Sequence, residues 1–354
     1  MYIYTSCINK HIKGVNVLEN RLLDTDIEIF QGSSDINIIG GNEHAKKSQR
    51  NAQWFSEIFE LTTKNSQAAL KYDGNSLRAW FNENPQHVLN TDLENNEDVL
   101  KLYFTQMIES DLKRATIVRH KDSVNKILKA MSLANPFVEN SLFGDWLKAA
   151  LKVKPAAQKQ AEGMDHKSLA MINENLSNEC PLEFRNKLIF NIAFDALLRA
   201  SEVCAIKIEH IDFNTETVYI PSSKTDQTGQ GEYLYLSDTT ISLIKQWIPL
   251  LKRKTGYLLR SLSPKKDIRN APLKYRTILD AFRAASVLAG KEYGFFTGHS
   301  GRVGAAITLA EKGASLFDIQ RAGRWANAAM PVVYTRKASA RLTGMGKISK
   351  DLGR

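Results

Sequence analysis

The chain has 354 residues, which is enough for two domains of ordinary size. Its 48 Lys and Arg exceed its 38 Asp and Glu, and the formal charge of +10 suits a polyanionic partner, although many basic proteins bind none. Cys7, Cys180 and Cys204 are odd in number and far apart, which argues against a disulfide framework and a zinc site and favours a cytoplasmic protein. Neither a membrane-spanning apolar run nor a signal peptide is predicted.

The first part of the chain divides into an extension and a helical region. Residues 1–44 mix Ile and Val with Gly, Asn and Asp, so we expect an N-terminal extension whose role the sequence does not reveal. Residues 45–152 carry apolar side chains at helical spacing, which predicts a small helical bundle. The four predicted stripes are Trp54, Phe55, Ile58, Phe59; Leu70, Leu77, Trp80, Phe81; Val99, Leu102, Tyr103, Met107, Ile108; and Ile117, Val124, Ile127, Leu128, Met131.

The fourth stripe is accompanied by basic residues, which make the bundle a candidate for DNA binding. They are placed on the other faces of the predicted helix, together with His120. A solvated helix face is the commoner explanation of such a pattern. The candidates for contact with a DNA backbone are Lys113, Arg114, Arg119, Lys121 and Lys126.

A polar segment with a Pro and a Gly, residues 153–164, predicts a linker to a second domain at 165–354. Pro181 occupies a favoured first-turn position of a helix that continues to about Leu198. Two strands, 217–220 and 232–236, flank a polar segment and predict a β-hairpin with a long tip. Helices are expected at 238–253, 273–289, 299–313 and 315–322. The predicted fold is mainly α with a small antiparallel β element.

Several residues of this second domain form a candidate catalytic set. His299 and Arg302 are three residues apart, so on a helix they share a face and reach a common phosphate. Arg199 ends an apolar helix and needs an anionic partner, which is either a phosphate or simply Glu202. Lys224 lies at the predicted hairpin tip, where it is either solvated or delivers a proton to a leaving oxygen.

Tyr334 lies 35 residues after His299 (334 − 299) and is either a packing residue or a nucleophile. A phenol has a pKa of roughly 10, so a nucleophilic tyrosine needs cationic neighbours or a base. Each of these motifs is weak by itself. In this order and spacing, however, they supply cationic donors for a phosphate, a proton-transfer group and a phenolic nucleophile.

The set resembles the tyrosine recombinase (phage integrase) family, and in particular its Cre-like branch. The resemblance covers about residues 165–340, and over 45–152 it rests only on the helical pattern and the basic faces. Trp325 stands where most of the family would have a second histidine, and its indole N–H donates a hydrogen bond but exchanges no proton. Gly301 stands where the Cre-like segment would have alanine. The segments that carry the resemblance are 197–202 (LLRASE), 298–306 (GHSGRVGAA) and 323–325 (GRW).

The resemblance implies a site-specific recombinase whose two domains clamp duplex DNA. It implies that Tyr334 attacks the scissile phosphate to form a 3′-phosphotyrosine bond, and that Lys224 protonates the leaving 5′-oxygen. Arg199, Arg302 and Trp325 would stabilise the transition state. His299 would act as acid, base or positioner, and Glu202 would orient Arg199 or His299. No metal, cofactor or ATP is expected.

The family also implies partners and a setting. A homotetramer on two DNA sites would exchange strands in pairs through a Holliday junction, in prokaryotic cytoplasm with the nucleoid or a plasmid. The basic tail after Tyr334 is either a frayed terminus or a helix that docks into a neighbouring subunit. Two other functions stay open: a non-enzymatic DNA-binding protein, and a type IB topoisomerase-like or hairpin telomere-resolving enzyme. Neither the DNA target nor the base-reading side chains follow from the sequence.

Overall fold

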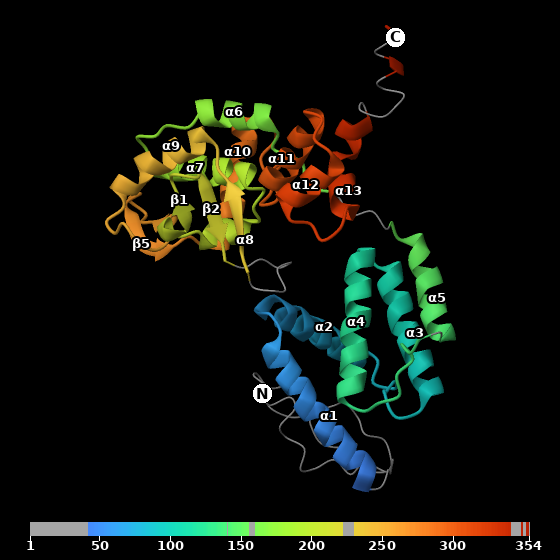
Figure 1. Cartoon of the computed structure of the whole chain (residues 1–354). Helices are drawn as coiled ribbons and strands as arrows, with labels where there is room; N and C mark the ends of the chain where they lie inside the picture. The colour runs from blue at the N-terminus through green and yellow to red at the C-terminus, as the bar shows by residue number, and fades with distance from the viewer. Residues whose placement is uncertain are drawn as a thin grey trace, which may run out of the picture. The chain divides into compact units, whose positions relative to one another are not determined.

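The computed structural model describes residues 42–139, 141–155, 160–221, 230–340, 348–349 and 352–353. It divides into two compact units, Met1–Gln158 and Lys159–Arg354, and this boundary falls within the predicted linker (Figure 1). Residues 1–41, Lys224 and most of the C-terminal tail lie outside the described residues, so the expectations for them are not addressed by the structure. No helix in the described ranges is long and apolar enough to cross a bilayer.

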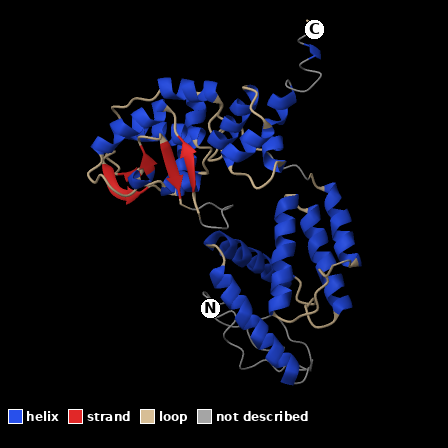
Figure 2. Ribbon diagram, in the orientation of Figure 1, coloured by secondary structure: helices blue, strands red, loops and turns tan. Residues whose placement is uncertain are grey.

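The regular structure described in the first unit is entirely helical, as Figure 2 shows. Polar side chains start three of the helices: Thr63, Asp92 and Ser141 each accept a hydrogen bond from a backbone N–H of the first turn. The core is formed by apolar and aromatic residues such as Leu100, Phe104 and Leu128. The helices are α1 (Asn42–Leu61), α2 (Lys64–Glu83), α3 (Leu93–Glu109), α4 (Arg114–Ala130), α5 (Leu142–Ala150) and the 3₁₀ turn η2 (Leu151–Val153).

The predicted apolar stripes correspond to α1–α4, but they are not buried equally. The stripes of α2, α3 and α4 supply most of the core, with the exception of the exposed Leu102. In α1, by contrast, Trp54 and Ile58 are exposed. Helix α5, which the sequence analysis did not predict, closes the bundle with Phe143 and Leu147.

The second unit is built around α7, which is buried on nearly all sides and packs against α9 and α11. This explains why its second half, 188–194, has apolar residues on most sides rather than along one stripe, with Asn191 as the polar exception. The helices of the unit are α6 (His166–Glu174), α7 (Pro181–Asp195), α8 (Ala200–Ala205), α9 (Asp238–Trp247), α10 (Tyr275–Leu288), α11 (Ser300–Glu311), α12 (Leu316–Gly323) and α13 (Ala329–Ala340), with 3₁₀ turns η3 (Ile208–His210) and η4 (Ile248–Leu250).

Two small antiparallel sheets complete this unit. One has the order β1-β2-β3, with β1 (Ile211–Asp212), β2 (Thr217–Ile220) and β3 (Glu232–Tyr235), and it contains the predicted hairpin, with Val218 opposite Leu234. The other pairs β4 (Arg260–Leu262) with β5 (Ile268–Pro272), and it was not predicted. The mainly helical architecture with a small antiparallel β component is therefore confirmed.

The segment that opens the second unit is bound to helix α11. The Met164 N–H donates to the carbonyl oxygen of Ser300 at 2.9 Å. A β-carbon added at Gly304 would lie 1.8 Å from the Met164 carbonyl oxygen, so only glycine allows this approach. The absence of one side chain thus lets the start of the second unit lie directly on the helix that begins after His299.

Candidate active site

The candidate catalytic residues that the structure describes come from four parts of the second unit. Arg199 is the N-cap of α8, and Glu202 lies in the first turn of that helix. His299 is the N-cap of α11 and Arg302 is in its first turn. Trp325 follows α12, and Tyr334 lies in α13. The seventh residue, Lys224, falls in the undescribed tip of the β2–β3 hairpin.

Arg302 is held rigidly between two chain segments, and its side chain is buried. Its Nη1 donates to the carbonyl oxygen of Leu197 at 2.6 Å, and its Nη2 donates to the carbonyl oxygen of Gly323. Its guanidinium lies over the Trp325 ring, 4.1 Å from the ring centroid. A guanidinium has five N–H donors, so these two bonds use only part of its capacity to bind an anion.

The backbone on both sides of Arg302 is unusual. Leu197, just after α7, has φ of 45°, and Arg324, the C-cap of α12, has φ of 56° and ψ of 44°. Left-handed residues commonly end helices, but glycine normally occupies them. Leu197 itself supplies one of the carbonyl oxygens that accept from Arg302, and Arg324 directly follows Gly323, which supplies the other. The ends of α7 and α12 therefore both contact Arg302.

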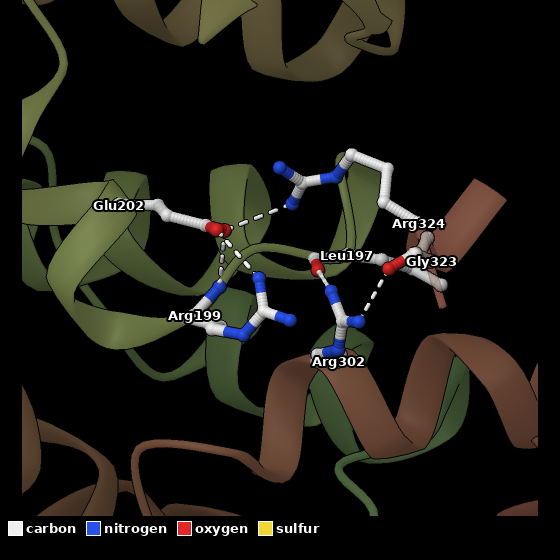
Figure 3. A network of polar contacts seen from close by, with 6 residues as sticks. All are labelled: Leu197, Arg199, Glu202, Arg302, Gly323 and Arg324. Atoms are coloured by element: carbon white, nitrogen blue, oxygen red, sulfur yellow. Dashed lines mark hydrogen bonds and ion pairs between the residues drawn. The ribbon is translucent and has the colours of Figure 1, made fainter. Parts of the chain in front are cut away.

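Glu202 is a buried carboxylate that binds two arginines (Figure 3). Its Oε1 accepts from Arg199 Nη1 at 2.7 Å, and its Oε2 accepts from Arg324 Nη2 at 2.8 Å and from the Arg199 backbone N–H at 2.9 Å. Of the two partners considered for Arg199, the carboxylate is therefore present. The Arg199 side chain is nevertheless 20% exposed, so it also remains accessible to a phosphate.

The electrostatics of the site favour a bound anion. Burial would raise the pKa of Glu202, but the charge of Arg324 and hydrogen bonds from Arg199 and Arg324 outweigh it, so this pKa lies below its ordinary value. Burial, with Arg199 and Arg324 nearby, lowers the pKa of Arg302 to about 9. At neutral pH the cluster therefore holds three positive charges against one negative charge.

The nucleophile candidate lies against this cluster. The rings of Trp325 and Tyr334 have centroids 5.8 Å apart. Burial raises the pKa of Tyr334, although Arg302 and Arg199 act in the opposite direction, so the phenol is protonated at neutral pH and needs a base. The pKa of His299 is lowered by partial desolvation and by Arg302 and Arg199, so its imidazole is neutral and able to accept a proton.

The five basic residues suggested for DNA binding are on more than one side of helix α4. All belong to the start or body of α4, with Lys113 as its N-cap. At about 100° per residue, Arg114 and Lys121 share one side of the helix, and Arg119 and Lys126 share another side about 140° away. The two pairs therefore face in different directions.

His120 was expected on the polar surface of this helix, and that expectation is wrong. Only 3% of it is exposed, because its Nε2 lies 2.8 Å from Oδ1 of the fully buried Asp73 on α2. The same carboxylate accepts from Arg119 Nη1 at 2.5 Å and from Ser123 Oγ at 2.7 Å. Asp73 thus joins α2 to α4, and Arg119 additionally lies over the exposed ring of Tyr72.

The residue of the site that the sequence analysis missed is Arg324. It stands between the glycine and the tryptophan of the 323–325 motif, and its ion pair spans 122 residues of sequence. Nothing local to Arg324 indicates such a distant partner. The one available signal is that its partner, Glu202, was already expected to orient an arginine.

The comparisons with known proteins give the family of the chain. Residues 162–341 match the model of the phage integrase family, which is more than half of the chain. The chain belongs to the phage integrase family. It is a site-specific recombinase of the tyrosine class that acts on DNA.

The individual relatives have low sequence identity to the chain, but the matches cover about two thirds or more of it. The chain is similar to the recombinase Cre of Escherichia phage P1, with 25% identity over 77% of this chain and 82% of Cre. It is 22% identical to a XerD homologue of Selenomonas ruminantium, over 66% of this chain and 71% of the relative. The match to Cre supports the resemblance to the Cre-like branch.

Solved structures share the fold. The XerH recombinase in its post-cleavage complex with palindromic difH has a TM-score of 0.61 at 15% identity, covering 88% of this chain and 90% of XerH. The Tn1549 transposon integrase bound to transposon right-end DNA has a TM-score of 0.60 at 15% identity, covering 86% of this chain and 97% of the integrase. At this identity the likeness concerns the fold alone.

Proposed function

We propose that Tyr334 is the nucleophile of a metal-free strand transfer on duplex DNA. Its phenolic oxygen attacks the scissile phosphorus and forms a 3′-phosphotyrosine bond, while the bond to the 5′-oxygen breaks. The phenol gives its proton to the neutral His299, and the departing 5′-oxygen leaves as a hydroxyl after it receives a proton from Lys224. Attack by the 5′-hydroxyl of a second strand reverses these steps and rejoins the DNA.

The observation that supports this proposal is the arginine-rich cluster beside Tyr334. Arg199 and Arg302 would bind the non-bridging oxygens of the phosphate, and the indole N–H of Trp325 would add another donor. Because Arg302 is fixed by two carbonyl oxygens and by the Trp325 ring, its charge is already in place before the reaction begins. Groups fixed in this way stabilise a developing charge without having to reorganise.

The protonation states also fit the proposal. The Tyr334 phenol holds its proton at neutral pH, and a neutral imidazole belongs to the same cluster. Binding of the negatively charged phosphate would be compensated by the surplus of arginines rather than by a metal ion. No cluster of His, Cys, Asp or Glu suited to a metal occurs among the residues that the structure describes.

We further propose that the helical unit, 45–152, is the core-binding domain, that residues 165–354 form the catalytic domain, and that the active assembly is a tetramer on two sites. Lys113, Arg114, Arg119, Lys121 and Lys126 are the candidates for backbone contacts. The tail beyond residue 340 would dock into a neighbouring subunit. Deleting residues 340–354 should then preserve binding to a single site and abolish the pairing of two sites, whereas full recombination by the truncated protein would contradict this.

The test of the nucleophile uses DNA that flanks the protein's own gene. The wild-type protein should form an SDS-resistant protein–DNA adduct in the presence of EDTA, and Tyr334→Phe should bind the same DNA without forming it. Tyr233→Phe is a matched control, because Tyr233 is an exposed tyrosine on β3. An adduct that survives in Tyr334→Phe would show that another residue is the nucleophile.

A second experiment separates recombination from related chemistry. A plasmid with two copies of the target should yield crossed-over products and, transiently, four-way junctions. Relaxation of a plasmid with one target would instead indicate a topoisomerase-like enzyme, and closed hairpin ends would indicate a telomere resolvase. Binding without any adduct would indicate a non-catalytic DNA-binding protein.

A further inference from the structure

Arg324 stands out in the site because its backbone conformation is unfavourable for it. It adopts a left-handed conformation at the end of α12, with φ of 56° and ψ of 44°, where glycine would be free of strain. A non-glycine residue persists in such a conformation when its surroundings hold it there, and these positions concentrate at functional sites. The contacts of the Arg324 side chain identify what holds it.

The Arg324 guanidinium is directed to the carboxylate that holds Arg199. Its Nη2 donates to Glu202 Oε2 at 2.8 Å, and the other oxygen, Oε1, accepts from Arg199 Nη1 at 2.7 Å (Figure 3). Both partners of this ion pair are almost fully buried, with 4% of the Arg324 side chain and 7% of Glu202 exposed. Arg199 is the more accessible arginine, with 20% of its side chain exposed.

The neighbours of Arg324 in the chain also contact the site. Gly323 accepts a hydrogen bond from Arg302 through its carbonyl oxygen, and the Trp325 ring lies under the Arg302 guanidinium. Three consecutive residues, 323 to 325, therefore all contact the cluster: Gly323 and Trp325 contact Arg302, and Arg324 contacts Glu202. Since Arg324 binds α8 while its neighbours bind α11, the segment after α12 connects the two helix starts that carry Arg199 and Arg302.

The burial of Arg324 decides between two ways in which it could act. A phosphate would have to reach a guanidinium that is 4% exposed and already bound to a carboxylate, whereas Arg199 and Trp325 are accessible. Arg324 is thus a positioning residue and not a ligand of the phosphate. With one oxygen of Glu202 occupied by Arg324, the other oxygen is directed to Arg199.

We infer that Arg324 positions Arg199 for strand cleavage by binding Glu202, and that it thereby couples the α12–α13 segment to α8. This inference rests on the proposed function, since it assigns a role within the same site. It predicts that the loss of Arg324 slows the chemical step more than it weakens DNA binding. It also predicts that the loss has little further effect once Glu202 has been changed.

The test is a double-mutant cycle with Arg324→Gly and Glu202→Gln. Glycine suits the left-handed backbone, so Arg324→Gly removes the ion pair without adding strain. The measured quantities are the single-turnover rate of adduct formation at saturating DNA and, in a Tyr334→Phe background, the affinity for the same DNA. Arg324→Gly should slow adduct formation between about tenfold and about a hundredfold, as expected for a misplaced catalytic group, and leave the affinity nearly unchanged.

Two controls distinguish positioning from a general structural effect. Lys266 is exposed and also left-handed, with φ of 66°, in the turn between β4 and β5, so Lys266→Gly makes the same backbone change outside the site and should retain the full rate. Arg324→Lys keeps the positive charge and should recover part of the rate. If Arg324→Gly unfolds at a lower temperature, Arg324→Gln, which removes the charge and keeps a long side chain, replaces it in the cycle.

The outcomes separate this inference from the proposed function. Non-additive rate losses in the cycle support it, because two residues that act through one interaction cannot lose it twice. A wild-type rate in Arg324→Gly, or losses that add fully, would overturn it. Failure of the wild-type protein itself to form an adduct would instead overturn the proposed function, and this inference with it.

Discussion

Each unit of the molecule buries one carboxylate among cationic or polar side chains, and the two clusters differ in their balance of charge. In the helical unit, Asp73 binds Arg119, His120 and Ser123. Burial lowers the pKa of His120, with Arg119 acting in the same direction and Asp73 opposing it, so the ring is neutral and Arg119 alone balances Asp73. In the second unit, Glu202 is outnumbered by Arg199, Arg302 and Arg324.

On the proposed function, the balanced cluster around Asp73 serves stability, and the positively charged cluster around Glu202 serves reactivity. A buried charge that is fully balanced by its neighbours gains nothing from a further ion. A cluster with a surplus of positive charge is tolerated because a ligand completes it, and perturbed pKa values concentrate at such sites. We therefore expect changes around Asp73 to affect folding, and changes around Glu202 to affect catalysis.

The largest expected effect concerns Arg302. Lysine at this position keeps the charge but cannot bind two carbonyl oxygens in the planar geometry of a guanidinium or stack on Trp325 in the same way. Arg302→Lys should lower the single-turnover rate of adduct formation by about 10²–10³-fold, as measured with saturating DNA. Arg276→Lys, at an exposed arginine of α10, provides the matched control and should retain the wild-type rate.

The next effect tests the other cluster. Asp73→Asn removes the charged acceptor of Arg119, His120 and Ser123, and it should lower the free energy of unfolding of the helical unit by about 1.5–3 kcal/mol. Hydrogen exchange of α4 amides in the intact protein measures this loss. Asp122→Asn, at an exposed carboxylate beside Lys121, should be nearly neutral. An equal loss in both variants would mean that burial of Asp73 does not matter.

A third test uses the pH dependence of cleavage. The pKa of His299 lies below its ordinary value of 6.5, so the neutral, proton-accepting form predominates at and above pH 6.5. The rate at subsaturating DNA should therefore change little from pH 8 to pH 7 and fall at lower pH, by up to about tenfold for each unit below the folded-state pKa. His299→Gln should be slower and lack this acid limb, whereas an unchanged limb would exclude His299 as its origin.

The smallest effect is the contribution of His120 to stability. Because its pKa is lowered in the folded protein, the unfolded chain binds more protons below pH 6.5, and acidification should destabilise the fold. The slope is at most about 1.4 kcal/mol per pH unit and applies between pH 6.5 and the folded-state pKa. His120→Gln should remove this contribution when α4 hydrogen exchange is followed from pH 7 to pH 5.

The sequence predicted the features whose signals are local. The stripe of α4, the first-turn Pro181 of α7 and the paired strands β2 and β3 all follow from spacing and turn residues within a few positions. Helix α5 was missed although Phe143 and Leu147 stand at helical spacing, because it is short and contains Gly144. The β4–β5 hairpin was missed because β5 is mostly exposed and lacks the alternation of a half-buried strand.

The candidate site could be predicted only in part, because only its local features leave a signal in the sequence. Motif order indicated Arg199, His299, Arg302, Trp325 and Tyr334, and the short spacing of Arg199 and Glu202 indicated their contact. Contacts between distant segments were not visible. His120 was assigned to the wrong face because its partner, Asp73, is on another helix, and Arg324 was overlooked because Glu202 is 122 residues away.

The dispersal of the site along the chain has a consequence for the protein while it is being synthesised. Arg199 precedes Tyr334 by 135 residues (334 − 199), and the segment that fixes Arg302 and Glu202 is made only shortly before the tyrosine. A nascent chain that ends before residue 323 therefore has neither the segment that binds Arg302 and Glu202 nor the tyrosine. On the proposed mechanism, a chain that is terminated before residue 334 cannot attach itself to DNA through this tyrosine, so incomplete translation products leave DNA uncut by this chemistry.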